Sequence, residues 1–127
     1  MRQLVELLLQ KGVDSNAKDV IGRNCLFFAI RHGDIHMLKL LLNNGAAVDY
    51  KDNEDQTCLF SAAKKLNQEI VHLLLDHGAD INGKDRGGQN VLSHLDLLKE
   101  RDNKINKKLK QMKVFLIKRG AKSGILQ

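Results

Sequence analysis

The residues of this 127-residue chain that could do chemistry are few and scattered. Two cysteines, Cys25 and Cys58, lie 33 positions apart, and the five histidines do not follow the spacing of zinc ligands. The sequence contains no glycine-rich phosphate loop, no serine–histidine–aspartate or cysteine–histidine order, and no recognisable pair of carboxylates. We therefore expect no catalytic residue, no metal site and no cofactor.

The two cysteines belong to a repeated segment. Residues 52–84 align with residues 19–51 without a gap, and eleven of the 33 positions are identical. A fixed period of this length is typical of a stacked array of similar units. The identical pairs include Asp19/Asp52, Cys25/Cys58, Leu26/Leu59, Ala29/Ala62, Leu40/Leu73, Leu41/Leu74 and Gly45/Gly78.

Each unit is predicted to form an aspartate-led turn and two short helices. Thr57 stands where a first helix would begin, and its hydroxyl is expected to cap a free backbone N–H. Asn67 is expected to cap the second helix, in which apolar residues recur at helical spacing from Ile70 onward. Gly78 ends that helix, where a left-handed residue is favoured. Neither helix can bury its apolar face alone, so the units must stack.

This layout resembles the ankyrin repeat, a 33-residue unit with a β-turn, two helices and a Thr-Pro-Leu-His-x-Ala signature. The corresponding segments are TCLFSA (57–62), NCLFFA (24–29) and NVLSHL (90–95), and the units close with GADIN (78–82) and GAAVD (45–49). Cysteine replaces the proline, and phenylalanine or serine replaces the histidine. The resemblance implies an all-α repeat solenoid that binds proteins and has no catalytic activity.

We interpret residues 1–127 as a single domain. Residues 1–18 form a partial repeat, residues 19–51 and 52–84 are full repeats, and residues 85–127 are a last repeat with an insertion. The partial repeat corresponds to a second helix without its first. It marks either a cut from a longer array, which we favour, or a lone capping helix. A cut edge would expose leucines, so we expect a monomer that can dimerise through this edge.

The insertion is visible in the spacing of the closing glycines. Gly120 follows Gly78 by 42 positions instead of 33, so about nine residues are extra. We predict a longer second helix from about Lys104 to Arg119, capped by Asp102 or Asn103. Its predicted apolar seam consists of Ile105, Leu109, Met112 and Leu116, which recur at helical intervals.

The net charge of +6 is concentrated near the C-terminus. Residues 99–122 contain ten basic and two acidic residues, a charge of +8, so the remainder carries −2. This basic patch would attract an acidic protein, anionic lipid or nucleic acid, but the solvated face of a terminal helix has the same composition. Nucleic acid is the weaker ligand, because aromatic residues make up only 4% of the chain. The patch residues are Lys104, Lys107, Lys108, Lys110 and Lys113.

The resemblance also implies where a partner binds, namely in a groove between the loop tips and the inner face of the first helices. The tip positions are Val20, Ile21, Arg23, Asn53, Glu54, Gln56, Arg86, Gly87 and Gln89. The helix positions are Arg31, His32, Lys64, Lys65, Leu97 and Leu98, and a lysine precedes each turn at Lys18, Lys51 and Lys84. The surplus of positive charge predicts an acidic or phosphorylated peptide with an apolar anchor near Val20–Ile21 or Leu97–Leu98. The alternative is that these lysines only keep the surface soluble.

The sequence predicts an intracellular protein, in the cytoplasm or else the nucleus. No apolar run is long enough to span a bilayer, and the N-terminus does not have the layout of a signal peptide. Cys25 and Cys58 would lie roughly 8–10 Å apart on stacked helices, beyond the reach of a disulfide, so both are expected to be reduced.

The resulting functional hypothesis is a protein-interaction module. Two alternatives stay open. The chain could be a targeting or regulatory segment of a larger enzyme, acyltransferase or channel, or its basic segment 99–122 could contact anionic lipid or nucleic acid.

Overall fold

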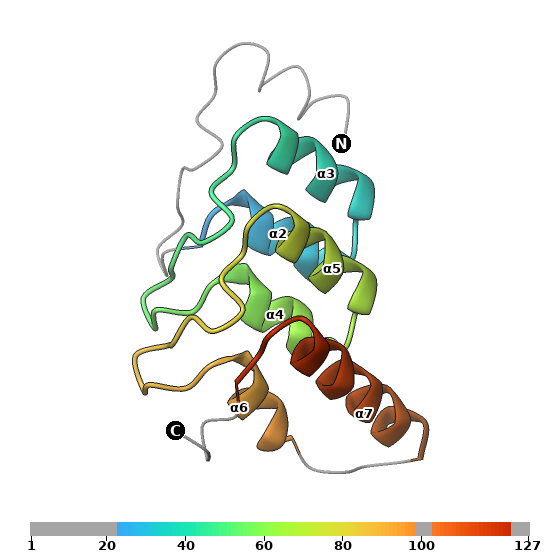
Figure 1. Cartoon of the computed structure of the whole chain (residues 1–127). Coiled ribbons are helices and arrows are strands. Elements are labelled where there is room, and N and C mark those ends of the chain that lie inside the picture. Colours follow the sequence, from blue (N-terminus) through green and yellow to red (C-terminus); the bar gives the residue numbers. More distant parts are fainter. Residues whose placement is uncertain (1–22, 99–102, 123–127) are drawn as a thin grey trace.

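The computed structural model describes residues 23–98 and 103–122. Within them the elements are all helices, and no strand occurs (Figure 1). The predicted partial repeat, the predicted binding residues Lys18, Val20 and Ile21, and the predicted cap Asp102 lie outside the described residues. The helices are α2 (Cys25–His32), α3 (Ile35–Asn43), α4 (Cys58–Lys64), α5 (Gln68–Asp76), α6 (Val91–Asp96) and α7 (Asn103–Lys118).

The helices form three consecutive pairs that stack on one another. The first helices make a central row in which α2 packs on α4 and α4 packs on α6. Each second helix, α3, α5 or α7, lies beside the first helix of its own pair (Figure 1). Short corners join the two helices of a pair on one side of the stack. Long loops join each pair to the next on the opposite side. The predicted all-α repeat solenoid is confirmed.

Short polar side chains begin the second helices as predicted. Asn67 Oδ1 accepts a hydrogen bond from Ile70 N at 3.1 Å, and Asp34 Oδ1 accepts one from Met37 N at 3.0 Å. Each bond satisfies a backbone donor that has no partner within the helix. Gly78, just past α5, has the left-handed φ of 91° that its position predicted.

The predicted cap at Thr57 is wrong in one respect. Helix α4 begins directly after Thr57, but the hydroxyl makes no capping hydrogen bond. Asn24 and Asn90 occupy the equivalent positions, and their side chains accept from Leu26 N and Ser93 N. The backbone is nearly the same, with φ of −89° at Thr57 and −91° at Asn24. The difference therefore lies in the side chain and not in the backbone.

One continuous apolar core runs through the stack. The middle helix α4 contributes two fully buried alanines, Ala62 and Ala63, whose small side chains let α2 and α6 approach it from both sides. Larger side chains fill the space between the first and second helices. The largest fully buried ones are Leu26, Ile30, Leu38, Leu59, Ile70, Val71, Leu74, Val91, Leu95, Met112 and Leu116.

The inserted helix agrees with its prediction to within one residue at each end. Helix α7 has 16 residues, whereas α3 and α5 have nine each. Leu109, Met112 and Leu116 are buried as predicted, but Ile105 is 38% exposed. Ile105 lies on the first turns of α7, which extend past the start of α5 (Figure 1), so the predicted seam is one turn too long.

Candidate functional site

The two described loop tips have the same internal structure. Asp52 Oδ1 accepts hydrogen bonds from Glu54 N at 2.8 Å and Gln56 N at 3.0 Å, and Asp85 Oδ1 accepts one from Gln89 N at 3.0 Å. Because the aspartate satisfies the backbone donors of its own turn, each tip is held rigidly in water. The turn chemistry predicted from the sequence is confirmed.

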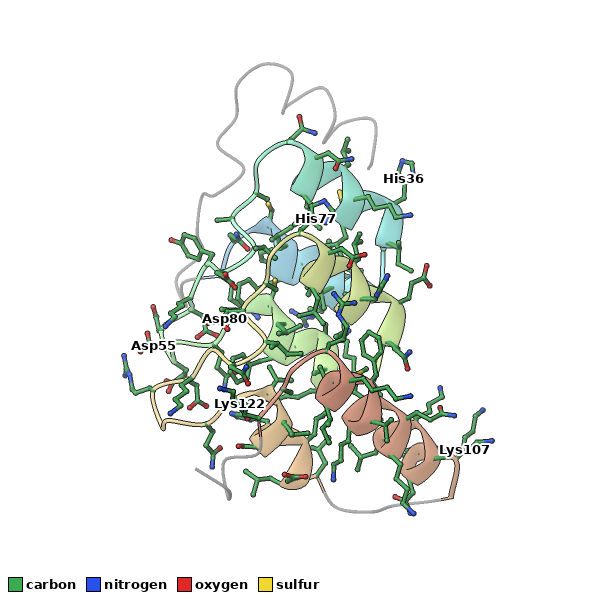
Figure 2. All side chains as sticks on the ribbon, viewed as in Figure 1. His36, Asp55, His77, Asp80, Lys107 and Lys122 are labelled. Carbon is green, nitrogen blue, oxygen red and sulfur yellow. The ribbon has the colours of Figure 1, made fainter. Side chains whose placement is uncertain are left out.

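Neighbouring tips are joined into one edge. Arg86 N donates a hydrogen bond to Glu54 O at 3.0 Å, which links the loop before α6 to the loop before α4. The side chains of Asn53, Glu54 and Arg86 are exposed, while Gln56 and Gln89 are partly buried. Asp55 marks this side of the molecule in Figure 2. The structure therefore brings the predicted tip residues of these two loops together.

A hydrogen-bonded pair of side chains beneath this edge was not anticipated. His94 Nε2 lies 2.6 Å from Asp85 Oδ2, and the two side chains are only 15% and 9% exposed. The Phe60 ring meets the His94 ring edge to face, with centroids 5.1 Å apart. Burial raises the pKa of Asp85, but the hydrogen bonds from Gln89 N and His94 more than offset it and hold the pKa below its usual 3.8. The hydrogen bond between Asp85 and His94 therefore connects the loop before α6 to α6 itself.

The sequence carried one signal for this pair. His94 is the only histidine of the sequence within a first-helix signature, where Phe28 and Ser61 hold the equivalent positions. Asp85 lies nine residues before His94, and this spacing alone does not predict that the two side chains meet.

The predicted helix residues lie at the other end of the first helices. Arg31, His32, Lys64 and Lys65 are all exposed at the C-terminal ends of α2 and α4. Lys65 Nζ donates to Arg31 O, so a cation satisfies the end of α2. An eight-residue helix is about 12 Å long. The tip residues and these helix-end residues therefore form two separate clusters.

The remaining predicted positions are accessible. Lys51 and Lys84 are exposed before their turns, and Leu97 is 65% exposed after α6. The Arg23 guanidinium lies 5.6 Å from the centre of the Phe28 ring. Phe28 is 43% exposed, an aromatic surface position that the sequence reasoning missed.

The lysines of α7 do not form one stripe. At 3.6 residues per turn, Lys108 and Lys110 point about 200° apart, and they border different hollows beside the helix. Lys113 Nζ pairs with Asp96 Oδ1 at 3.1 Å and is partly buried. Lys104 and Lys107 are exposed, and Lys107 lies far from the loop tips (Figure 2). The five lysines of the predicted basic patch therefore cover a broad arc of the helix opposite its buried seam.

Cys25 and Cys58 lie in equivalent helices, and Cys58 is inaccessible. Neither cysteine forms a disulfide, and Cys58 is 1% exposed. Burial, reinforced by the nearby Asp49, raises the pKa of the Cys58 thiol to about 12, so almost none of it is thiolate at neutral pH. Among residues 23–98 and 103–122, no group of three His, Cys, Asp or Glu side chains could hold a metal ion. None of the helices described is long and apolar enough to cross a membrane.

Comparison with known proteins adds one family match. The sequence profile of a family described as ankyrin repeats (3 copies) matches residues 1–85, two thirds of the 127 residues. The matched segment ends at the beginning of the loop that precedes α6. No curated protein matches the chain.

Proposed function

Because this chain belongs to the ankyrin repeat family, whose members generally act as protein-interaction modules, we propose that it binds a partner protein through its loop tips and first helices. One observation carries the proposal. The Arg86 N to Glu54 O bond joins successive tips into a continuous edge whose side chains reach into solvent. A rigid edge loses little conformational entropy when a partner docks, which favours binding.

The charge of this surface supports an acidic partner. Lys51, Lys84 and Arg86 are exposed along the tips, and Arg31 and Lys64 are exposed at the helix ends. Asp52, Glu54, Asp55 and Asp85 oppose the three cations of the tips, so the surplus of positive charge comes from the helix ends. The favoured ligand is therefore a protein segment rich in aspartate, glutamate or phosphorylated residues.

Two triple variants of equal charge test this proposal. Lys51→Glu/Lys84→Glu/Arg86→Glu reverses the tips, and Lys104→Glu/Lys107→Glu/Lys110→Glu makes the same charge change on exposed positions of α7. Affinity capture from cell lysate at two salt concentrations compares both with the wild type. We expect one discrete protein to bind the wild type and the α7 variant, and to be lost from the tip variant. Equal retention by both variants would contradict the proposal.

A membrane or nucleic-acid role for α7 is less favoured. A helix that lies on a lipid surface presents one free apolar face between basic borders, whereas the apolar face of α7, with Leu109, Met112 and Leu116, is buried in the core. Recovery of lipid or nucleic acid by the wild type at low salt only, with loss in the α7 variant, would move the function to this helix.

A further inference from the structure

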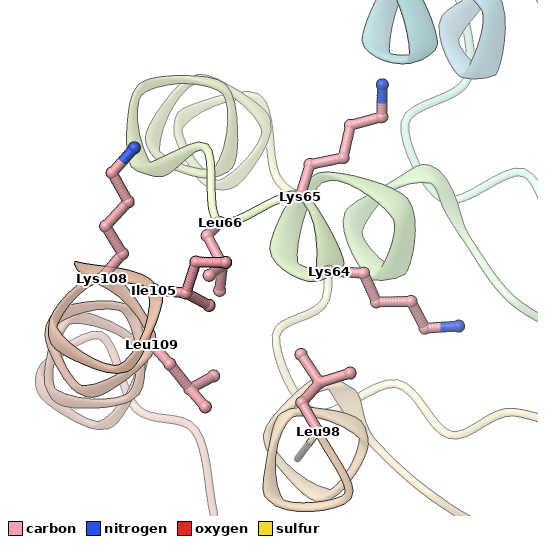
Figure 3. Close-up of a pocket in the computed structure, with 7 residues that line it drawn as sticks. All are labelled: Lys64, Lys65, Leu66, Leu98, Ile105, Lys108 and Leu109. Atoms are coloured by element: carbon pink, nitrogen blue, oxygen red, sulfur yellow. The ribbon is translucent and has the colours of Figure 1, made fainter. Parts of the chain in front are cut away.

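A groove opens at the corner side of the stack, between the α4–α5 corner, the end of α6 and the first turns of α7 (Figure 3). Its volume is about 400 Å³. Leu66, Leu98, Ile105 and Leu109 form its apolar lining. It exists because α7 is longer than α5, so its extra turns stand beside the α4–α5 corner with no helix of the previous pair against them.

The floor of the groove contains an unusual backbone. Leu66 has a left-handed φ of 58°, which is unfavourable for a leucine. Leu66 N donates to Ala63 O and Asn67 N donates to Ala62 O, the hydrogen-bond pattern that normally ends a helix on a glycine. The preceding unit does have a glycine at this position, Gly33, with a φ of 66°. The strained backbone is held by the Leu66 side chain, which packs against the core on one side and lines the groove on the other.

Positive charge surrounds the apolar lining. Lys64 and Lys108 project on opposite sides of the leucines, and their aliphatic stems form part of the wall (Figure 3). In the part of the chain that the structure describes, neither lysine is paired with a carboxylate. Lys65 also borders the groove, but its ammonium group is bonded to Arg31 O. Among the described residues, none that lines the groove is acidic.

We propose that this groove binds a segment of a partner protein in which one apolar side chain is flanked on both sides by carboxylates. The apolar side chain would cover Leu66 and Ile105, and the carboxylates would meet Lys64 on one wall and Lys108 on the other. A fatty acid has one carboxylate and could meet only one wall, and a flat membrane surface cannot enter a concavity. The groove lies at the corner side of the stack, away from the loop tips, and shares only Lys64 and Lys65 with the surface of the proposed function. The apolar pocket and Lys108 go beyond that surface.

The proposal can be tested with a synthetic probe. The probe is a peptide with blocked ends and one leucine between two pairs of glutamates, titrated into the whole chain carrying ¹³C-labelled leucine and isoleucine methyl groups. We expect methyl shifts at Leu66, Leu98 and Ile105 that saturate. A peptide with alanine in place of the leucine should bind about tenfold more weakly or worse, since most of the apolar burial is lost.

Variants of the groove separate a binding role from a purely structural one. Leu66→Gly and Leu66→Asn both suit a left-handed backbone. Relief of the left-handed strain offsets part of the packing that Leu66 makes with the core, so both variants should stay folded, as their melting curves will show. They should weaken the peptide at least about tenfold. Lys108→Glu should weaken it severalfold, whereas Lys107→Glu, an equal charge change on the same helix outside the groove, should have little effect.

Several results would overturn the proposal. These are no saturable shifts at the groove with millimolar peptide, equal binding of the alanine peptide, or full affinity in both Leu66 variants. Equal effects of Lys107→Glu and Lys108→Glu would reduce the interaction to unspecific charge attraction. Groove shifts produced by a fatty acid or by phosphatidylserine vesicles but not by the peptide would assign the groove to lipid instead. The triple tip variant should bind the peptide like the wild type, so failure of the tip proposal remains distinguishable.

Discussion

Asp52 and Asp85 lead equivalent turns, but they are held differently. Both carboxylates accept backbone hydrogen bonds from their own loop. Only Asp85 has a second side-chain partner, His94, in a site where the Asp85 side chain is 9% exposed. A hydrogen bond to a charged group is worth more than a neutral one, so Asp85 should contribute more to stability than Asp52.

We predict that Asp85→Asn lowers the free energy of unfolding by about 1–2 kcal/mol at pH 6, because the asparagine keeps the turn but loses the charged bond to His94. The pKa of Asp85 is lowered in the folded protein, so its contribution is present above the unfolded value of about 3.9. This stabilisation is lost as the pH falls through the pKa that Asp85 has in the folded protein. Urea unfolding at pH 6 and pH 3 should therefore show the wild type and variant converging in acid.

The matched control for this prediction is Asp52→Asn. It makes the same chemical change in a turn that lacks the histidine, and it should cost less at pH 6. An equal cost for both variants, or a constant difference between wild type and Asp85→Asn at both pH values, would contradict a special role for the Asp85–His94 pair.

At the scale of the helix, Asn24 and Asn90 each do two things. Each caps the first helix of its pair, and each donates from its side-chain amide to the chain that follows the second helix of that pair. Asn24 Nδ2 donates to Ala47 O at 3.2 Å, and Asn90 Nδ2 donates to Lys122 O at 2.7 Å. Thr57, between them in the stack, has no capping bond. Asparagine at this position therefore closes a helix pair as well as starting it.

We predict that Asn90→Ala costs about 2 kcal/mol of stability, since it removes a helix cap and a second hydrogen bond. Thr57→Ala should cost less than about 1 kcal/mol, because no cap is lost. Thermal unfolding of the two variants under the same conditions measures the difference. A larger loss for Thr57→Ala would show that the buried methyl group matters more than the asparagine bonds.

At the scale of the whole molecule, the last helix pair has a different outer surface. Ile30 and Ala63, which are 33 positions apart and fully buried, are followed at the same spacing by Asp96. In the second helices, Leu38 and Val71 are also fully buried, and Lys113 is their counterpart after the insertion. An Asp96–Lys113 ion pair thus stands where earlier pairs bury apolar side chains against the next pair.

We predict that Asp96→Ala/Lys113→Val makes the protein self-associate, because it restores the apolar positions through which helix pairs stack. Sedimentation velocity should show a concentration-dependent shift toward a dimer that the wild type lacks at the same concentration. The charge-preserving swap Asp96→Lys/Lys113→Asp is the control and should sediment like the wild type. An unchanged sedimentation coefficient for the apolar variant would show that the ion pair does not limit stacking.

Much of the fold could be predicted from residues that act locally. The 33-residue period located the helix pairs, and the predictions at Asn67, Gly78 and the inserted helix held, because a cap or a helix end depends on a few adjacent residues. Thr57 shows the limit of local reasoning, since the residue type and backbone were suitable and the bond was absent.

The sequence by itself determined the repeat, the buried face of each helix and the excess of positive charge, because these follow from the order of side chains along a regular backbone. Only the tertiary structure decided which distant side chains meet. It paired Asp85 with His94 and divided the lysines of α7 between different sides of the helix. It also placed Lys64 and Lys108 on opposite walls of one groove, although the sequence had assigned these two lysines to separate sites. The contacts of α7 could not be predicted from the repeat, because the insertion makes α7 longer than α5, the second helix of the preceding pair.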